Sequence, residues 1–299
     1  MNTRVLAAAL LVASSAPAEA NIDIQFDYSH DASGFFHDAG RRSALDAAAN
    51  LFENRFSDQL TGITSSGSNH FDTVFLNPAD PSGATVVNSN DSFAANVIRV
   101  YVGGFNFTDN TLGEGGPGGY NCSGMGGFCE DATRRGQGVV RGASAVDVAP
   151  WGGSITFDTN TNWYFGTRSG GLAPSQYDFY SVAVHELGHV LGFGTSDSFA
   201  NHVVGTNFVG AASGTVPLSA DLSHWAEGTT GLYDGAWQEA AMTPSIANGT
   251  RKNFTQLDFA GMQDIGWQVT AIPEASTWAM MLSGLALVGG VARRRHLAH

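Results

Sequence analysis

The residues best suited to chemistry stand together in the pentad His185-Glu186-Leu187-Gly188-His189. Two histidines four positions apart on a helix lie on one face, about one turn apart, where both imidazoles can bind one zinc ion. Glu186 stands beside them and can reach a water molecule at that ion. A catalytic zinc has three protein ligands and a water, polarises a carbonyl and brings the pKa of the water to about 7. The pentad therefore predicts hydrolysis of a peptide bond, with Glu186 taking the proton of the water and passing it to the leaving amine.

The third zinc ligand must come from another part of the chain. Three residues that follow a reversal of the chain after the pentad are candidates: His224, Asp197 and His202. Asp197 has a second interpretation, as a carboxylate that orients one of the imidazoles. If Asp197 instead joined all three histidines, four protein ligands would close the site, which is typical of structural zinc.

The sequence around the pentad resembles that of the metzincin metallopeptidases. In His185-Glu186-x-x-His189-x-x-Gly192 the glycine matches one that lets the chain turn sharply, but Thr195 stands where a third His or Asp usually follows. Ser223-His224-Trp225 and the later Ala241-Met242-Thr243-Pro244 are similar to leishmanolysin-type metzincins, in which an insertion precedes the third His and a Met-turn follows it. The resemblance implies that His224 is the third ligand and that Met242 forms a hydrophobic floor beneath the zinc.

The resemblance also implies an α+β fold of the zincin and metzincin kind, with a twisted mixed sheet, an active-site helix and a largely irregular C-terminal half. In metzincins an edge strand before the active-site helix pairs antiparallel with the substrate backbone, and we assign residues 153–158 to it. Protein or peptide substrates and one catalytic Zn²⁺ follow from the same resemblance. It allows Ca²⁺ as well, although no Asp-rich loop has a spacing that places it.

The periodicity of apolar residues predicts the elements that position the pentad. The helix that carries it begins with Ser175 as N-cap and ends at Gly192. A final helix spans residues 255–265, where Thr255 and Asp258 form a capping-box pattern. The other predicted elements are a strand at residues 22–26, a helix at 41–60 ended by Gly62, and a strand at 96–102.

Residues 103–127 are rich in glycine and lack periodicity, so they predict a long loop. Cys122 and Cys129 are the two cysteines of the chain, and a disulfide between them would staple this segment. Among the aromatic residues, we expect Trp225 and Trp237 to lie in the core.

The composition agrees with a single folded domain. The chain has 299 residues, of which 43% are apolar, and we find no repeat or charge block between residues 21 and 271, so one metallopeptidase domain and a monomer are expected. Lys and Arg together number 14 and Asp and Glu 27, and the resulting net charge of -13 disfavours binding to nucleic acid.

The two ends resemble targeting segments rather than parts of the fold. Residues 1–20 contain Arg4, an apolar run and Ala18-Glu19-Ala20, a pattern typical of a cleaved signal peptide. Residues 272–299 contain Pro273-Glu274, an apolar run near the lower length limit for a transmembrane helix, and Arg293-Arg294-Arg295. This second segment resembles the PEP-CTERM sorting signal of Gram-negative bacteria, although Ala275 stands where a second Pro is usual.

The sorting signal implies where the protein acts and what processes it. We expect export through the inner membrane, transient membrane contact through the C-terminal helix, processing by an exosortase, and a secreted or cell-surface protein. A plain C-terminal membrane anchor is the alternative interpretation of the tail. A function of another class, a noncatalytic surface or matrix protein with a structural zinc site, would also agree with the tail, the low charge and the high glycine content.

Overall fold

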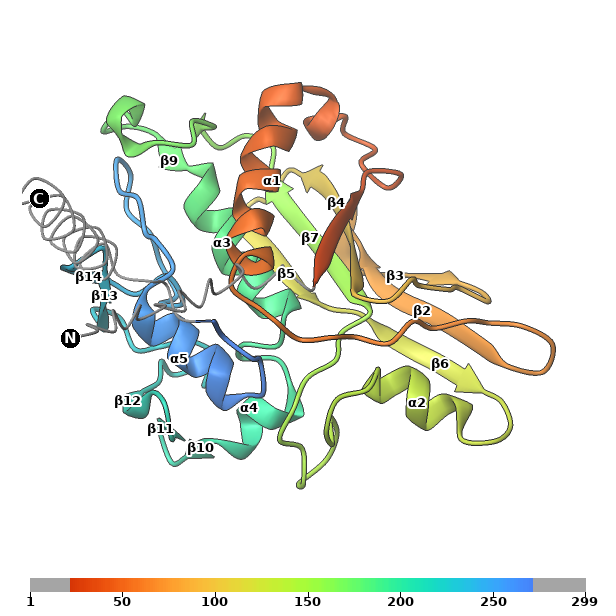
Figure 1. The fold of residues 1–299 in the computed structure, drawn as a ribbon. Helices are drawn as coiled ribbons and strands as arrows, with labels where there is room; N and C mark the ends of the chain where they lie inside the picture. Colours follow the sequence, from red (N-terminus) through yellow and green to blue (C-terminus); the bar gives the residue numbers. More distant parts are fainter. Residues whose placement is uncertain (1–21, 271–299) are drawn as a thin grey trace, which may run out of the picture.

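The computed structural model describes residues 22–270, so the predicted signal peptide at 1–20 and the sorting segment at 272–299 lie outside the described residues. Its central sheet has the strand order β1-β4-β7-β5 (Figure 1). Strands β1 (Asp23–Asp27), β4 (Val97–Phe105) and β7 (Gly152–Asp158) are parallel, and β5 (Gly113–Pro117) pairs antiparallel with β7. The sheet is therefore mixed, with β5 as the edge strand next to β7.

Two helices lie side by side on one face of this sheet, α1 (Ala39–Glu53) and α3 (Phe179–Val190) (Figure 1). Helix α1 buries Leu45, Ala48 and Phe52. The rings of Phe157 and Phe179 lie 4.6 Å apart between the sheet and α3, with further aromatic side chains around them. Burial of these rings fixes α3 against the sheet, because each contributes roughly 2–3 kcal/mol on transfer from water. The chemistry of the pentad is thus carried by a helix anchored along its length.

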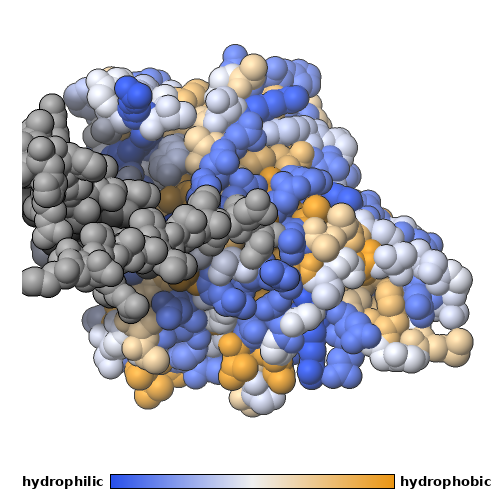
Figure 2. All heavy atoms as spheres, in the orientation of Figure 1, coloured by the Kyte–Doolittle hydropathy of each residue, from blue (hydrophilic) through white to orange (hydrophobic). Residues whose placement is uncertain are grey.

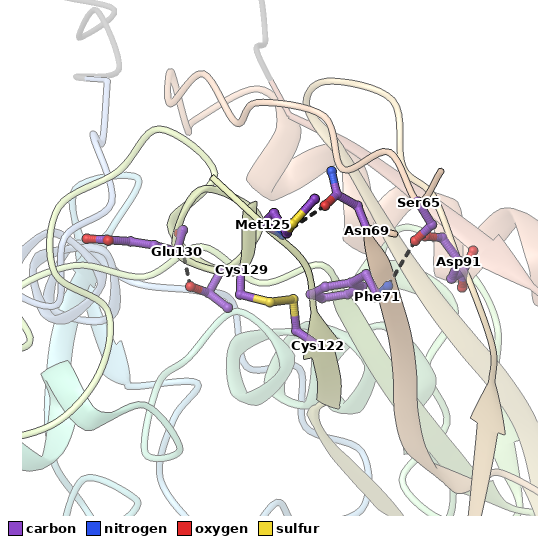
Figure 3. The surroundings of a disulfide bond; sticks show 9 residues. Ser65, Asn69, Phe71, Asp91, Cys122, Met125, Cys129 and Glu130 are labelled. Atoms are coloured by element: carbon purple, nitrogen blue, oxygen red, sulfur yellow. Dashed lines mark hydrogen bonds between the residues drawn. A yellow bond between two sulfur atoms is a disulfide. The ribbon is translucent and has the colours of Figure 1, made fainter. Parts of the chain in front are cut away.

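A second sheet extends from the central one (Figure 1), with the order β3-β2-β6. It consists of β2 (His70–Asn77), β3 (Asp80–Asn88) and β6 (Gly119–Ser123), and α2 (Phe128–Arg134) follows β6. The predicted disulfide between Cys122 and Cys129 is present and joins β6 to α2 beside Phe71 (Figure 3). Trp151, Phe71 and Phe75 form part of a separate small core beneath this sheet.

The prediction of one long loop over residues 103–127 is wrong, because this segment contains β5 and β6. Glycines hid the alternation that would have marked β5. A Cβ atom on Gly115 would lie 2.8 Å from the carbonyl oxygen of Glu186, so the face of β5 toward α3 has no room for side chains. The assignment of residues 153–158 to the edge strand is also wrong. These residues form β7, which is an inner strand because β5, hidden by its glycines, pairs with its outer side.

Two helix boundaries differ from prediction. Helix α1 ends at Glu53 rather than Leu60, because the following segment pairs with the end of the domain through a bridge between Phe56 and Val269. Helix α3 begins at Phe179, after Asp178 as N-cap, because Tyr177–Asp178 is the short strand β9 that pairs with β8 (Trp163–Tyr164). The prediction of a capped helix at 255–265 is confirmed by α5 (Gln256–Asp264).

Beyond Gly194 the chain forms only short elements, in line with the irregular half expected. Trp225 is fully buried there, whereas Trp237 is 69% exposed on a hairpin, so its predicted place in the core is wrong. The short elements after Gly194 other than α5 are α4 (Asp197–Asn201), β10 (Val203–Val204), β11 (Asn207–Gly210), β12 (Gly214–Pro217), β13 (Thr230–Tyr233) and β14 (Ala236–Glu239). Two 3-10 turns lie earlier, at Phe35–His37 and Ser169–Gly171.

The described part exposes polar side chains over much of one face. The face in Figure 2 is largely hydrophilic, with hydrophobic residues in small separate groups. Between residues 22 and 270, none of the helices combines the length and the apolar character needed to cross a bilayer.

Candidate metal centre

Three imidazoles converge at the C-terminal half of α3. His185 and His189 come from α3, and His224 comes from the segment between β12 and β13. The Nε2 atom of His189 lies 3.0 Å from that of His185 and 3.0 Å from that of His224, and the remaining Nε2 pair is 3.2 Å apart. Within residues 22–270 this is the one group of three or more His, Cys, Asp or Glu residues placed to hold a metal ion.

Each imidazole is oriented by a partner of its Nδ1 atom. His185 Nδ1 lies 2.8 Å from the carbonyl oxygen of Ala241, and His189 Nδ1 lies 2.9 Å from that of Phe193. His224 Nδ1 lies 2.8 Å from a carboxylate oxygen of Asp221. Because an acceptor holds the proton on Nδ1, all three rings present an unprotonated Nε2 to the common point.

The surroundings of His185 and His189 keep these two rings neutral. Burial first, and then the mutual repulsion of the rings, hold the pKa of His185 well below its usual range. The same two causes lower the pKa of His189 to about 4. Since a metal competes with protons for the ring nitrogen, neutral imidazoles at pH 7 are ready to bind it.

Glu186 lies on the wall of the cleft next to β5. Its side chain is only 6% exposed, and burial raises its pKa to about 8, although a hydrogen bond from the backbone N–H of Gly115 acts in the opposite direction. A Cβ atom on Gly113 would lie 3.2 Å from a carboxylate oxygen of Glu186. The glycines of the edge strand therefore allow β5 to press directly on the one carboxylate of the pentad.

The turn after α3 brings His224 to the other two histidines. Gly192 and Gly194 have φ values of 107° and 71°, in the region that favours glycine. A Cβ atom on Gly194 would lie 2.2 Å from the carbonyl oxygen of Ser223. Glycine at this position therefore lets the segment with His224 pass next to the turn.

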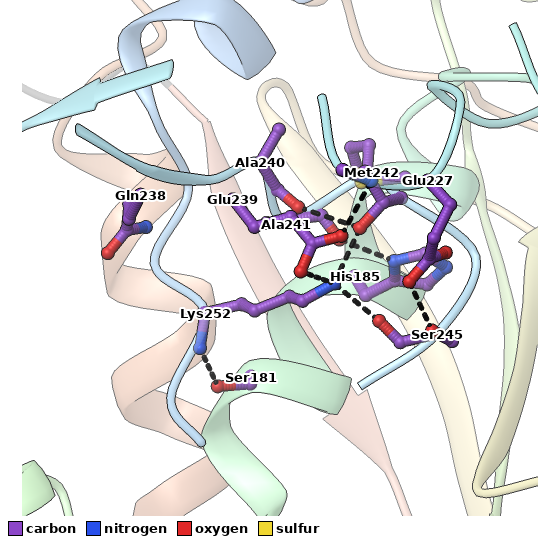
Figure 4. Close-up of polar contacts among 12 residues, drawn as sticks. Ser181, His185, Glu227, Gln238, Glu239, Ala240, Ala241, Met242, Ser245 and Lys252 are labelled. Carbon is purple, nitrogen blue, oxygen red and sulfur yellow. Dashed lines mark hydrogen bonds and ion pairs between the residues drawn. The ribbon is translucent and has the colours of Figure 1, made fainter. Parts of the chain in front are cut away.

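Met242 lies against helix α3 at Gly188, within the pentad. It is fully buried, and a Cβ atom on Gly188 would lie 2.7 Å from its sulfur. Figure 4 shows His185 beside the turn of Ala241 and Met242. This turn is held by Asp258 in α5, whose carboxylate accepts the N–H groups of Ala241 and Met242 at 3.0 and 3.2 Å.

The two rival ligands lie elsewhere. Asp197 begins α4 and accepts a hydrogen bond from the N–H of Gly142 at 2.6 Å. His202 has both ring nitrogens within 2.8 Å of backbone oxygens, those of Val209 and Asp264. Thr195, at the place of the usual third ligand, donates to the carbonyl oxygen of His189 at 2.7 Å.

The histidines open into a cleft of about 870 Å³. One wall is formed by β5 and the residues before it, and the other by residues 243–246. At its base the buried Lys252 ion-pairs with Glu239 at 3.0 Å and donates to Thr243 at 2.6 Å (Figure 4). The cleft thus has room for a short stretch of polypeptide in an extended conformation.

Reasoning from the sequence missed three contributors to this site. Asp221 stands three residues before His224, and that spacing was a usable signal for a carboxylate partner. Lys252 carries no local signal, because its partners are distant in the chain. The glycines of β5 looked like loop residues, because Gly113, Gly115 and Gly116 give the segment no apolar alternation.

Comparisons with known proteins agree with this geometry. Residues 135–221 match the family model for matrixin, and residues 271–295 match that for the PEP-CTERM protein-sorting motif. The chain therefore contains one segment similar to matrixin and one similar to a protein-sorting motif, in agreement with the metzincin and PEP-CTERM resemblances predicted from the sequence. The matrixin match includes the pentad and ends before His224. Searches of curated proteins and of solved structures found no match.

Proposed function

We propose that this protein is an exported zinc-dependent endopeptidase in which His185, His189 and His224 bind the zinc and Glu186 is the general base. The proposal is carried by one observation: three Nε2 atoms lie within 3.2 Å of one another, beside a buried carboxylate and on an open cleft. The match to matrixin supports the same chemistry.

The donor set fits zinc. Nitrogens bound at about 2.0–2.1 Å in a tetrahedral site lie roughly 3.3 Å apart, close to the separations of 3.0–3.2 Å found here. Each ring uses Nδ1 to donate a hydrogen bond, so Nε2 is available to the metal. Three protein ligands leave a fourth position for water or substrate, as catalytic zinc requires.

Glu186 and β5 have separate roles in the proposed hydrolysis. Zinc bound there would polarise the scissile carbonyl and, as a nearby positive charge, would favour the ionised form of Glu186. Glu186 would accept a proton from the attacking water at its carboxylate and deliver it to the leaving amine. The N–H of Gly115 would hold that carboxylate in place. The free edge of β5 would pair with the substrate backbone and so orient the peptide bond.

Zinc content and peptide cleavage test the proposal together. The purified full chain is expected to hold about one zinc, measured by mass spectrometry of the metal. His224→Ala should lose most of it, whereas His202→Ala, which removes a rival ligand, should keep it. Zinc retained in His224→Ala and lost in His202→Ala would overturn the ligand assignment.

The role of Glu186 needs a separate variant. Glu186→Ala should bind zinc like the wild type but cleave peptides about 100- to 10,000-fold more slowly. If this variant cleaves at the wild-type rate, Glu186 is not the base. Stoichiometric zinc in a wild type that cleaves no peptide would favour the noncatalytic alternative, in which the metal is structural.

We further propose that residues 21–271 form one peptidase domain, a monomer, between a cleaved signal peptide and the sorting segment. An exosortase would process the segment at 272–299 after export, releasing the domain from the membrane or attaching it to the cell surface. The mass of the protein recovered from the cell surface and the medium tests both cleavages.

A further inference from the structure

A second cavity, of about 160 Å³, lies outside the cleft of the metal centre. It is open to solvent and is bordered by β6, α2, the residues before β7 and the turn after α3. Its walls are mainly apolar and include Phe71, Tyr120, Val148, Trp151 and Leu191. A cavity of about 150 Å³ with apolar walls can hold a benzene molecule. The second cavity therefore has room for one aromatic or large aliphatic side chain.

The polar groups at this cavity have partners within the protein. The guanidinium of Arg141 lies over the ring of Tyr120, 4.5 Å from its centroid. The carboxylate of Asp197 accepts the N–H of Gly142. The indole N–H of Trp151 donates to the carbonyl oxygen of Gly119 at 3.0 Å. The ring of Tyr120 also stacks on Phe71, with centroids 5.2 Å apart, so the apolar surface that a ligand would meet comes mainly from Val148, Trp151 and Leu191.

The second cavity adjoins the cleft. Thr195 lines both of them. At the start of β5, Gly113 and Gly115 line the cleft, whereas Pro117 at its end and Gly118 line the second cavity. A polypeptide that lies along β5 from the metal centre toward β6 would therefore reach the second cavity.

One edge of β5 has no strand beside it among the described residues and faces the path of such a polypeptide. The carbonyl oxygen of Leu112 accepts the N–H of Asp158, and the N–H of Gly118 donates to Gly152, both at 2.9 Å. Because alternate residues of a strand turn their backbone groups to the same neighbour, the backbone groups of Gly113 and Gly115 point away from β7. The N–H of Gly115 donates to Glu186, so a substrate would meet Gly113 and the outward carbonyl oxygens of this edge. Pro117, which has no N–H, also falls in this outward set, as expected for an edge.

We propose that the second cavity is a substrate subsite that binds an apolar side chain on the N-terminal side of the scissile bond. The inference rests on the proposed peptidase function. A substrate antiparallel to β5 runs from β6 toward the metal centre, so the residues at the second cavity precede the scissile bond near Gly115. Strand residues advance about 3.3 Å each, and the cavity extends from Pro117 to Tyr120. The subsite therefore takes the side chain about three to five residues before the bond.

Cleavage of a proteome-derived peptide mixture, read by mass spectrometry, tests the subsite. The full-length wild type should enrich Phe, Tyr, Leu or Met at one position three to five residues before the cut. Ala149→Phe and Thr133→Phe, which place a ring in the cavity, should abolish that enrichment and leave the other positions unchanged. For a single peptide with Phe at that position, kcat/KM should fall about tenfold or more. Thr215→Phe, on exposed β12, is the matched control and should behave like the wild type.

Two results would overturn the subsite: no enrichment at any of these positions, or enrichment that persists in both filled variants with wild-type zinc content and circular dichroism. If the zinc-loaded wild type cleaves nothing, the proposed function fails. Peptide binding then tests separately whether the second cavity holds an apolar side chain. Calorimetric titration with an acetylated hexapeptide that contains one Phe should then show binding to the wild type and its loss in Ala149→Phe. Equal binding to both proteins, or binding to neither, would reject the subsite.

Discussion

Asp221 holds His224 through a hydrogen bond of 2.8 Å between its carboxylate and Nδ1 of the ring. The other two histidines of the centre donate to backbone oxygens, so His224 is the one that a side chain orients. Although partial burial acts to raise it, hydrogen bonds from Ser219, Ser223 and His224 lower the pKa of Asp221 to about 2. The carboxylate is therefore ionised throughout the pH range in which histidine binds metal.

Removal of this carboxylate should weaken zinc binding. Asp221→Ala is expected to lower zinc affinity about 10- to 100-fold, because the ring of His224 loses the partner that fixes its orientation and tautomer. Asp221→Asn, which keeps an acceptor oxygen, should lose less. Competition with a chelator measures both affinities. Glu130→Ala removes an exposed carboxylate on α2 and serves as control; an equal loss there would mean that net charge, not contact with His224, sets the affinity.

Asp258 should stabilise the site from beneath. Its buried carboxylate accepts hydrogen bonds from Ala241, Met242, Trp225 and Thr255. Asp258→Ala would leave these buried donors unpaired and is expected to lower the free energy of unfolding by about 3 kcal/mol or more. Urea unfolding measures this change.

The hydrogen bonds to Asp258 also predict weaker metal binding in a variant that keeps one acceptor oxygen. Asp258→Asn, with one acceptor oxygen left, should fold but bind zinc more weakly, because Trp225 follows His224 directly. Gln256→Ala, exposed on the same helix, is the control. Wild-type zinc affinity in a destabilised Asp258→Asn would show that the Met242 turn does not position the histidines.

The close approach of β5 to α3 can be tested with two neighbouring glycines. A Cβ atom on Gly115 would lie 2.8 and 2.9 Å from backbone oxygen and Cβ of Glu186, whereas one on Gly116 would meet nothing within 4 Å. Gly115→Ala should therefore displace the edge strand from Glu186 and lower kcat/KM about tenfold or more, with zinc content unchanged. Gly116→Ala should keep wild-type activity. Equal activities of the two variants would contradict the proposed restraint on Glu186.

Stability should depend on pH through Asp58, which is not part of the metal centre. Burial, with a further contribution from Asp147, raises the pKa of Asp58 to about 6 from an ordinary value of 3.8. The folded state then binds the proton more tightly than the unfolded chain, so this group lowers the free energy of unfolding as pH rises from about 4 to 6.

Asp58→Asn removes that dependence and keeps an acceptor for the N–H of Gln268. Relative to the wild type, the variant should gain about 1–2 kcal/mol between pH 4 and 7, after allowance for solvent screening. Urea unfolding of both proteins at several pH values measures the difference. A difference that does not change with pH would show that the pKa of Asp58 is ordinary in the folded protein.

Local spacing in the sequence was enough to predict that His185, Glu186 and His189 lie together. The period of a helix alone places His185 and His189 on one face with Glu186 beside them. The capping box of Thr255 and Asp258 involves neighbours three positions apart, and the disulfide joins cysteines within one short segment. In each case the partners are close in the chain, so few alternative conformations compete.

Contacts between distant segments decided the rest. Whether His224, Asp197 or His202 meets the pentad depends on the path of the turn at Gly192 and Gly194, which only packing fixes. The place of β5 at the edge of the sheet depends on its pairing with β7, and its glycines carry no apolar alternation that could have shown it. Strand order follows from hydrogen bonds between segments far apart in sequence, and periodicity along one segment contains no information about its neighbour.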